Sequence, residues 1–274
     1  MRNRVRIATL ALSMIVLAAG SLSAHDFFFR LDDYFVKPES TIKVRAFNGT
    51  FSSSENSITR DRLSDLSVVS AAGRDHPDTV SWSFAGDTSV LTVHIGRPGT
   101  YVIGASLRPR LIELKAKEFN QYLAEDGIPD VLAERRKKNE LERDATERYS
   151  KHIKAIVQAG TARTGDFSAV LGYPAEIVPL DNPYSLRVGS NIRVRAMVDG
   201  RAVPNQLVVA GGRNARGGRF AEQKVRTDAS GVALVKLSSA GQWYVKFIRM
   251  LPNTSPGKFD YESKWATLTF AIRP

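Results

Sequence analysis

The amino-acid sequence predicts a mainly β protein with two β-sandwich domains and a helical insertion between them. Apolar and polar residues alternate in several runs, which is the period of a half-buried strand. These runs occur in the same order in both halves of the chain. TIKVRAFNGT at 41–50 aligns with NIRVRAMVDG at 191–200, and VLTVHIGRPGTYVIGA at 90–105 aligns with VALVKLSSAGQWYVKF at 232–247. The segments 90–105 and 232–247 each contain an alternating strand, a glycine turn and a strand with an aromatic residue. We therefore expect two sandwiches of similar plan.

The chain begins with the features of a secretory signal peptide over residues 1–24. MRNRVR carries three arginines, an apolar run extends to Gly20, and the small residues SLSA follow at 21–24. The apolar run is shorter than the roughly 20 residues that a membrane span needs. No cysteine near the junction can carry a lipid. We expect export to the periplasm or the medium without a membrane anchor, and cleavage after either Ser23 or Ala24.

Composition excludes several classes of function. The net charge is +11 over 274 residues, and loss of the three signal-peptide arginines leaves +8. Basic and acidic residues are interleaved, as in ERRKKNELERDATER, so we expect a solvated surface and no nucleic-acid partner. The chain has no cysteine, which excludes disulfides, thiolate metal sites and cysteine nucleophiles. It also has no GxSxG, P-loop or HExxH motif, so we expect no enzyme activity.

The first sandwich is predicted over 25–110 and a helical segment over 111–160. LIELKAKEFNQYL places Ile112, Ala116, Phe119 and Leu123 on one helical face, and Pro129 suits the start of a second helix. A further apolar stripe of helical spacing covers 141–157, where His152 is expected to be a packed structural residue. This stripe is formed by Leu141, Ala145, Tyr149, Ile153, Ile156 and Val157.

A connector over 161–175 leads into the second sandwich over 176–274. TDASGVALVKL followed by AGQWYVKF is a pattern that recurs in transthyretin-like and carboxypeptidase-regulatory-like sandwiches. We therefore expect both sandwiches to be of the immunoglobulin-like or transthyretin-like type.

Several segments, taken in order, resemble the family of domain of unknown function 4198. They are AHDFFFRLDDY, KEFNQYLAEDGI, ERYSKHIKAIVQAG, EIVPLDNPYSLRVG, TDASG with AGQWYV, and YESKWATLTF. The resemblance implies an exported protein, and some members accompany nickel or cobalt uptake transporters as periplasmic components. A membrane metal transporter is therefore the partner it implies. The chain departs from the family pattern at Phe28, where tryptophan is common, and at Arg249, where many relatives carry histidine.

The first functional hypothesis is a periplasmic protein that binds nickel, cobalt or copper as an accessory to metal uptake. Cleavage after Ala24 would give His25 a free amine beside its imidazole, and nickel and copper favour nitrogen ligands. The predicted metal ligands are His25, Asp26, His94 and Glu262. An ordinary ion pair between Glu262 and Arg249 is the alternative role for that carboxylate.

Two other functions remain open at this point. One is a non-catalytic envelope module whose sandwich loops bind a protein or a glycan. The other, the least favoured, is a copper oxygenase in which His25 and a second histidine, His94 or His76, form a brace. The oligomeric state is open.

Overall fold

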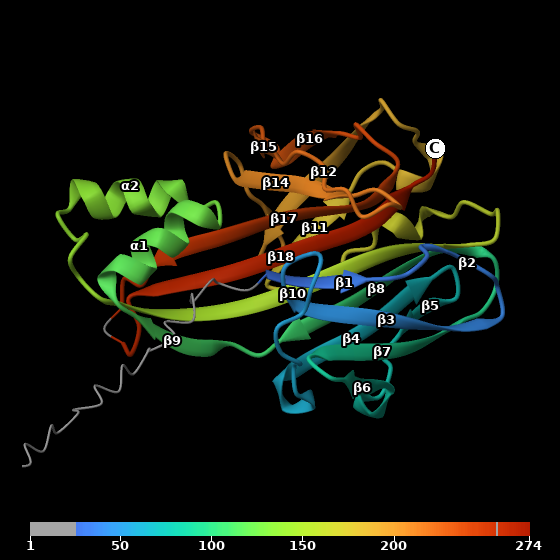
Figure 1. Ribbon diagram of the computed structural model, residues 1–274, viewed down its shortest axis with the longest axis horizontal. Coiled ribbons are helices and arrows are strands. Elements are labelled where there is room, and N and C mark those ends of the chain that lie inside the picture. Colours follow the sequence, from blue (N-terminus) through green and yellow to red (C-terminus); the bar gives the residue numbers. More distant parts are fainter. Residues whose placement is uncertain (1–25, 256) are drawn as a thin grey trace, which may run out of the picture.

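The computed structural model describes residues 26–255 and 257–274. The predicted signal peptide, its cleavage site and His25 lie outside the described residues. The described chain is mainly β with two short α-helices, α1 (Ala116–Glu125) and α2 (Pro129–Lys137), as Figure 1 shows. No helix in this part of the chain has the length and apolar character of a membrane span. The prediction of a mainly β protein is confirmed.

Residues 26–255 and 257–274 form three sheets. The first has the order β1-β3-β7-β6, and all its neighbours are antiparallel. Its strands are β1 (Asp26–Arg30), β3 (Ser40–Gly49), β6 (Trp82–Ala85) and β7 (Thr88–Ile95). The third sheet contains β11 (Ala175–Pro179), β12 (Asn191–Val198), β13 (Arg201–Ala202) and β16 (Val232–Lys236).

A ten-stranded sheet lies between these two and contains strands from both halves of the chain. Its order is β15-β14-β17-β18-β10-β8-β4-β5, with β2 and β9 also paired to β10. The early strands are β2 (Phe35–Val36), β4 (Leu63–Ser70), β5 (Gly73–Asp75), β8 (Gly99–Leu107), β9 (Arg110–Leu114) and β10 (Ala145–Ala159). The late strands are β14 (Leu207–Arg213), β15 (Gln223–Arg226), β17 (Gly241–Pro252) and β18 (Tyr261–Ile272). Short 3₁₀ turns are η1 (Arg60–Arg62), η2 (Thr79–Ser81), η3 (Gly165–Ser168) and η4 (Pro183–Ser185).

The parallel pair β10–β18 joins the two halves within the central sheet. The register places Glu147 beside Tyr261 and Lys151 beside Trp265. Ile153, Ala155 and Val157 of β10 belong to the core beneath the first sheet, whereas Ile156 belongs to the core beneath the third. Both faces of this strand are therefore covered. The domain boundaries predicted at 110 and 176 stay predictions.

The helix predicted over 141–157 is wrong, because most of these residues form β10 (Ala145–Ala159). A strand covered on both faces loses the simple alternation of apolar and polar residues. Its apolar residues then come from two opposite faces, and in this segment they fall by coincidence at helical spacing. The polar residues between them are buried as well, including His152 and Lys154.

The prediction of helix is confirmed at α1 and α2 but wrong at 111–114, which belongs to β9 (Arg110–Leu114). Ile112 lies opposite Glu147 of β10, so pairing with a distant strand decides the structure of this segment. The backbone N–H of Lys115 donates to the Glu118 carboxylate (3.3 Å), and that of Ala116 donates to Asp144 (2.9 Å), so the first turn of α1 is capped by acids. Gly127, with φ of +81°, ends the turn after α1, and α2 begins at Pro129 as expected. α1 buries Phe119, Tyr122 and Leu123 against the ends of β17 and β18. The helix pair thus covers one end of the central sheet (Figure 1).

Strand β1 is held on the central sheet by side chains as well as by its ladder to β3. The hydroxyl of Thr267 donates to the Phe27 carbonyl (2.7 Å), and that of Thr269 donates to the Phe29 carbonyl (2.8 Å). Phe27 and Phe29 point into the core beneath the first sheet, whereas Phe28 packs with Phe51 and Tyr244. Alternation in DFFFR therefore divides the three phenylalanines between two clusters.

Candidate functional site

The described metal-ligand candidates lie far apart. Asp26 and His94 both flank β3, where Asp26 is opposite Gly49 and His94 is opposite Thr41. Eight residues of strand separate these positions, which corresponds to about 26 Å at about 3.3 Å per residue. Lys246, which pairs with Asp26, lies opposite Thr267, five residues or about 17 Å along β18 from Glu262. The structure therefore does not bring Asp26, His94 and Glu262 together.

The two carboxylates among these candidates, Asp26 and Glu262, already have cationic partners. Asp26 forms an ion pair with Lys246, and the two side chains are only 13% and 11% exposed. Glu262 lies 3.5 Å from Arg148, so its partner is not Arg249, which lies opposite Lys264. Within 26–255 and 257–274, no three or more His, Cys, Asp and Glu side chains are grouped to hold a metal ion. These residues do not fit a shared metal site.

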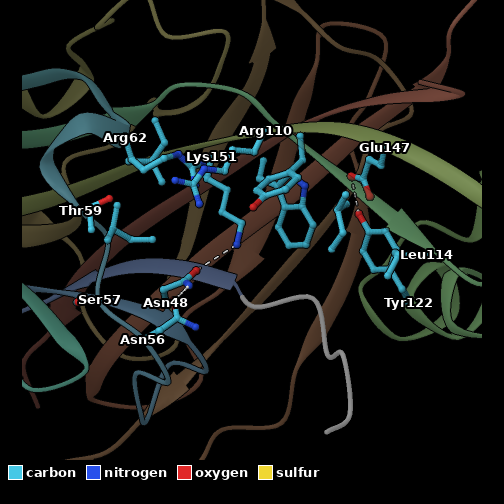
Figure 2. Close-up of a pocket in the computed structure, with 15 residues that line it drawn as sticks. Asn48, Asn56, Ser57, Thr59, Arg62, Arg110, Leu114, Tyr122, Glu147 and Lys151 are labelled. Carbon is cyan, nitrogen blue, oxygen red and sulfur yellow. Dashed lines mark hydrogen bonds between the residues drawn. The ribbon is translucent and has the colours of Figure 1, made fainter. Parts of the chain in front are cut away.

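A cavity of about 350 Å³ opens where β10 and β18 meet α1 and the loop after β3. We call it the seam cavity. Its walls are formed by side chains of β9, β10, β18, η1, α1 and residues 56–59 (Figure 2). Strand geometry explains one wall, because alternate residues of β10 point to the same face. Glu147, Tyr149 and Lys151 line the cavity for this reason, and the parallel neighbour β18 adds Trp265.

Lys151 supplies a buried cation at one end of the seam cavity. The residue is 8% exposed, and its ammonium donates to the Asn48 Oδ1 (3.1 Å), as Figure 2 shows. The ammonium also lies 5.2 Å from the centroid of the Trp265 ring and 5.5 Å from that of Tyr149. Burial lowers the pKa of Lys151 to about 8, although Asp26 and Glu147 oppose this effect. At neutral pH this lysine is therefore mostly protonated.

Arg62 brings a second cation from η1 to the same end. It is 6% exposed, its Nη2 donates to the Arg108 carbonyl (3.1 Å), and its guanidinium lies 5.9 Å from the Tyr149 ring centroid. The Nε–H is buried and has no hydrogen-bond partner among the described residues. Burial lowers the pKa of Arg62, but a guanidinium keeps its charge in proteins. A buried donor without an acceptor is costly, so this nitrogen lowers the stability of the fold at this point.

The other end of the seam cavity contains a buried acid. Glu147 is 2% exposed and accepts hydrogen bonds from the hydroxyls of Tyr122 (3.1 Å) and Ser263. Burial raises the pKa of Glu147, which favours the neutral carboxyl. The Tyr122 ring stacks on Trp265 with 5.9 Å between centroids and 4° between planes. The cavity thus has a cationic end, aromatic walls and a weakly acidic end (Figure 2).

Sequence reasoning missed this group of residues. Glu147, Tyr149 and Lys151 lie within the segment interpreted as a helix, where their period of two went unnoticed. The signal was present in ERYSK at 147–151, in which every second residue faces the cavity. Arg62 had no local signal, because its burial depends on contacts with residues 108 and 149.

His152, on the opposite face of β10, is structural as the sequence indicates. Its Nδ1 lies 2.8 Å from the Ser106 hydroxyl, and its Nε2 lies 3.0 Å from that of Ser150. Burial lowers the pKa of His152 to about 3. The imidazole is therefore neutral at ordinary pH and has both nitrogens engaged.

Comparison with known proteins gives one family and a set of distant structural matches, two of which follow. Residues 22–250 match the family described as a domain of unknown function (DUF4198). No curated protein matches the chain. Trypsin-activated alpha-2-macroglobulin from Escherichia coli aligns at 11% identity and a TM-score of 0.22, covering 97% of this chain but 17% of that protein. A two-domain fibronectin type-III segment of chicken tenascin aligns at 14% identity and a TM-score of 0.22, covering 91% of this chain and 99% of the segment.

Proposed function

We propose that this chain, which belongs to the DUF4198 family, is an exported binding protein that holds a small ligand in the seam cavity. The observation that carries the proposal is the grouping of Lys151, Arg62 and Glu147 with aromatic side chains around one hollow. Ligand sites are typically concave and combine apolar and aromatic walls with a few placed polar groups. A volume of about 350 Å³ lies at the lower end of the range for such sites, about 300–1,000 Å³.

Binding is favoured over catalysis by how the polar groups of the cavity are held. Glu147 is engaged by Tyr122 and Ser263, and Lys151 by Asn48. A general base needs a free lone pair within reach of the proton that it removes. Polar groups that are engaged in this way are suited instead to recognition.

Export to the periplasm or the medium is part of this proposal and rests on the signal-peptide pattern of residues 1–24. We also propose that the first and third sheets, with the two faces of the central sheet, are two related sandwiches of the immunoglobulin-like or transthyretin-like type. Support comes from the separate cores on the two sides of β10. The turn at Asp228 gives further support, since its carboxylate accepts from the N–H groups of Ser230 (2.8 Å) and Val232 (3.0 Å).

Metal binding at the N-terminus is the second candidate function, with a membrane metal transporter as the partner. One observation favours it: the Oδ1 of Asp26 is buried and has no hydrogen-bond partner among the described residues. This oxygen belongs to the residue next to His25. The ion pair with Lys246 weighs against it. Calorimetry with nickel and copper on protein that begins at His25 should show binding that is lost in His25→Ala. Equal affinity in both proteins would exclude His25 as the anchor.

The seam-cavity proposal is tested by ligand-induced stabilisation of the mature protein. Melting temperatures are measured with sugars, amino acids, organic acids and nucleosides at millimolar concentration. Ile112 lines the cavity from β9, whereas its neighbour Leu111 is 51% exposed. We expect a stabilising compound to lose its effect in Ile112→Trp, which fills the hollow, and to keep it in Leu111→Trp. The proposal fails if no compound stabilises the protein, or if each one acts equally on both variants.

A further inference from the structure

We infer that a second cavity, beside the first residues of β1, binds a free α-amino acid with an aromatic or large apolar side chain. This cavity of about 340 Å³ lies between the end of α1, the beginning of β1, the loop after β3 and the connection from β14 to β15. We call it the β1 cavity. Among the described residues, none lines both this cavity and the seam cavity, so the two sites are independent of each other.

The end of α1 gives the β1 cavity an acidic side. Asp126 follows the last residue of α1, lines the cavity and is partly exposed, so a ligand can reach it. No hydrogen bond or ion pair joins its carboxylate to another described residue. Burial raises the pKa of Asp126 to about 7, and Asp26 adds to this effect, whereas Lys246 opposes it but is itself paired with Asp26. The C-terminal end of a helix also carries partial negative charge, so this side favours a cation such as an ammonium group.

The connection from β14 to β15 gives the β1 cavity a basic side. Arg213 is the last residue of β14, Arg219 follows in the connection, and both line the cavity. Arg213 is partly exposed and Arg219 is exposed, so a ligand can reach both. Neither guanidinium forms a hydrogen bond or an ion pair with another described residue. A guanidinium binds a carboxylate through specific, charge-assisted hydrogen bonds, so this side favours a carboxylate.

Three aromatic side chains add an apolar surface to the β1 cavity. Phe28, Phe51 and Tyr244 pack together with 5.0–5.3 Å between ring centroids, and all three line the cavity. The Tyr244 ring is held further by its hydroxyl, which donates to the Glu222 carboxylate (2.6 Å). Rings held in this way offer a preorganised surface to an aromatic or large apolar side chain.

The spacing of the two charged sides suits a ligand that carries both charges. Gly127, the residue after Asp126, lies against β14, since a β-carbon placed on it would be 3.5 Å from the Val209 Cγ2. Arg213 lies four residues along β14 from Val209, which corresponds to about 13 Å. The two side chains with one amino acid between them can span this distance. A ligand with a single charge would leave either the acidic or the basic side without a counter-charge.

The test compares L-phenylalanine with two analogues that each lack one charge. Hydrocinnamate has no ammonium group, and phenethylamine has no carboxylate. Calorimetry is performed on the mature protein at pH 8, where Asp126 is mostly ionised because its pKa is about 7. We expect phenylalanine to bind at least tenfold more tightly than either analogue.

Two variants assign the charged groups of the ligand to the two sides of the cavity. Asp126→Asn should weaken phenylalanine and phenethylamine binding about tenfold and leave hydrocinnamate binding unchanged. Arg213→Met should weaken phenylalanine and hydrocinnamate binding about tenfold and leave phenethylamine binding unchanged. Two controls should affect none of the probes: Arg216→Met, in the same connection but outside the cavity lining, and Glu142→Gln, which changes an exposed acid elsewhere.

The outcomes separate this site from the seam cavity. Equal binding of the three probes, or no binding of phenylalanine at millimolar concentration, overturns the inference. A loss of equal size for all three probes in Asp126→Asn or Arg213→Met contradicts the charge assignment and overturns it as well. Ile112→Trp, which fills the seam cavity, should leave phenylalanine binding unchanged; a loss in this variant would place the amino acid in the seam cavity and support only the proposed function. The comparison of probes needs only the unmutated protein, so it holds even if a variant fails to fold.

Discussion

Acidification should destabilise the protein through His152, and the variant His152→Gln should reduce that loss. The imidazole is 2% exposed and its nitrogens contact two serine hydroxyls. Its pKa is about 3 in the folded protein, against the ordinary value of 6.5. Between these two values the unfolded chain binds a proton that the folded protein does not. Stability therefore falls as the pH drops below 6.5.

The magnitude follows from the two pKa values. At pH 5 the pH lies about 1.5 units below the pKa of the histidine in the unfolded chain. Each unit corresponds to about 1.4 kcal/mol, so protonation of the unfolded chain at His152 lowers the free energy of unfolding by about 2 kcal/mol. At pH 7 the same contribution is only a few tenths of a kcal/mol. The buried carboxyls shift the overall pH profile too, but they are common to both proteins. The difference between the protein and its variant isolates His152.

Urea denaturation at pH 7, 6 and 5 measures this difference. The free energy of unfolding of the unmutated protein should fall by about 2 kcal/mol more than that of His152→Gln between pH 7 and pH 5. A lower stability of the variant at pH 7 does not affect the comparison of slopes. Identical slopes in both proteins would show that His152 is not held neutral by burial, and the reasoning would be refuted.

Two further predictions concern other buried polar contacts. Lys154→Met should lower the free energy of unfolding by about 3–5 kcal/mol in urea denaturation, because it leaves Glu176 buried without its cation. Adding Glu176→Gln should recover part of this loss. Full additivity of the two changes would contradict the prediction. Thr267→Val should lower the free energy of unfolding by about 1–2 kcal/mol, because the Phe27 carbonyl loses its hydrogen-bond donor. Thr267→Ser keeps a hydroxyl and should lower it less. An equal loss in both variants would assign the effect to packing.

The local sequence pattern was sufficient to predict the secondary structure of elements that are buried on one face only. The alternation in TIKVRAF corresponds to β3. Of the predicted helical face, Ala116, Phe119 and Leu123 lie on α1, whereas Ile112 lies on β9. The pattern failed in β10, because a strand buried on both faces shows no clear period. The parallel pairing of β10 with β18 had no signal in either segment, since it joins residues that are more than 100 positions apart.

The site was harder to predict than the fold, because it too depends on contacts between residues that are distant in sequence. Lys151 and Arg62 resemble ordinary surface residues in the sequence, and only their burial makes them candidates for binding. That burial depends on the β10–β18 pairing and on the position of α1. The emphasis on His25, by contrast, came from its place after the signal-peptide pattern. This prediction stays open, because the residue lies outside the described residues.

The β10–β18 pair also has a consequence for how the chain reaches its folded state. Strand β10 is synthesised more than 100 residues before its neighbour β18, with Glu147 paired to Tyr261 at the beginning of the ladder. Until β18 arrives, β10 has one unpaired edge and an uncovered apolar face, which are the conditions that promote aggregation. Contacts between residues so distant in sequence are associated with slow folding. The last strand of the chain is therefore the element that closes the sheet, and a truncated product lacking it would present an open edge to its neighbours.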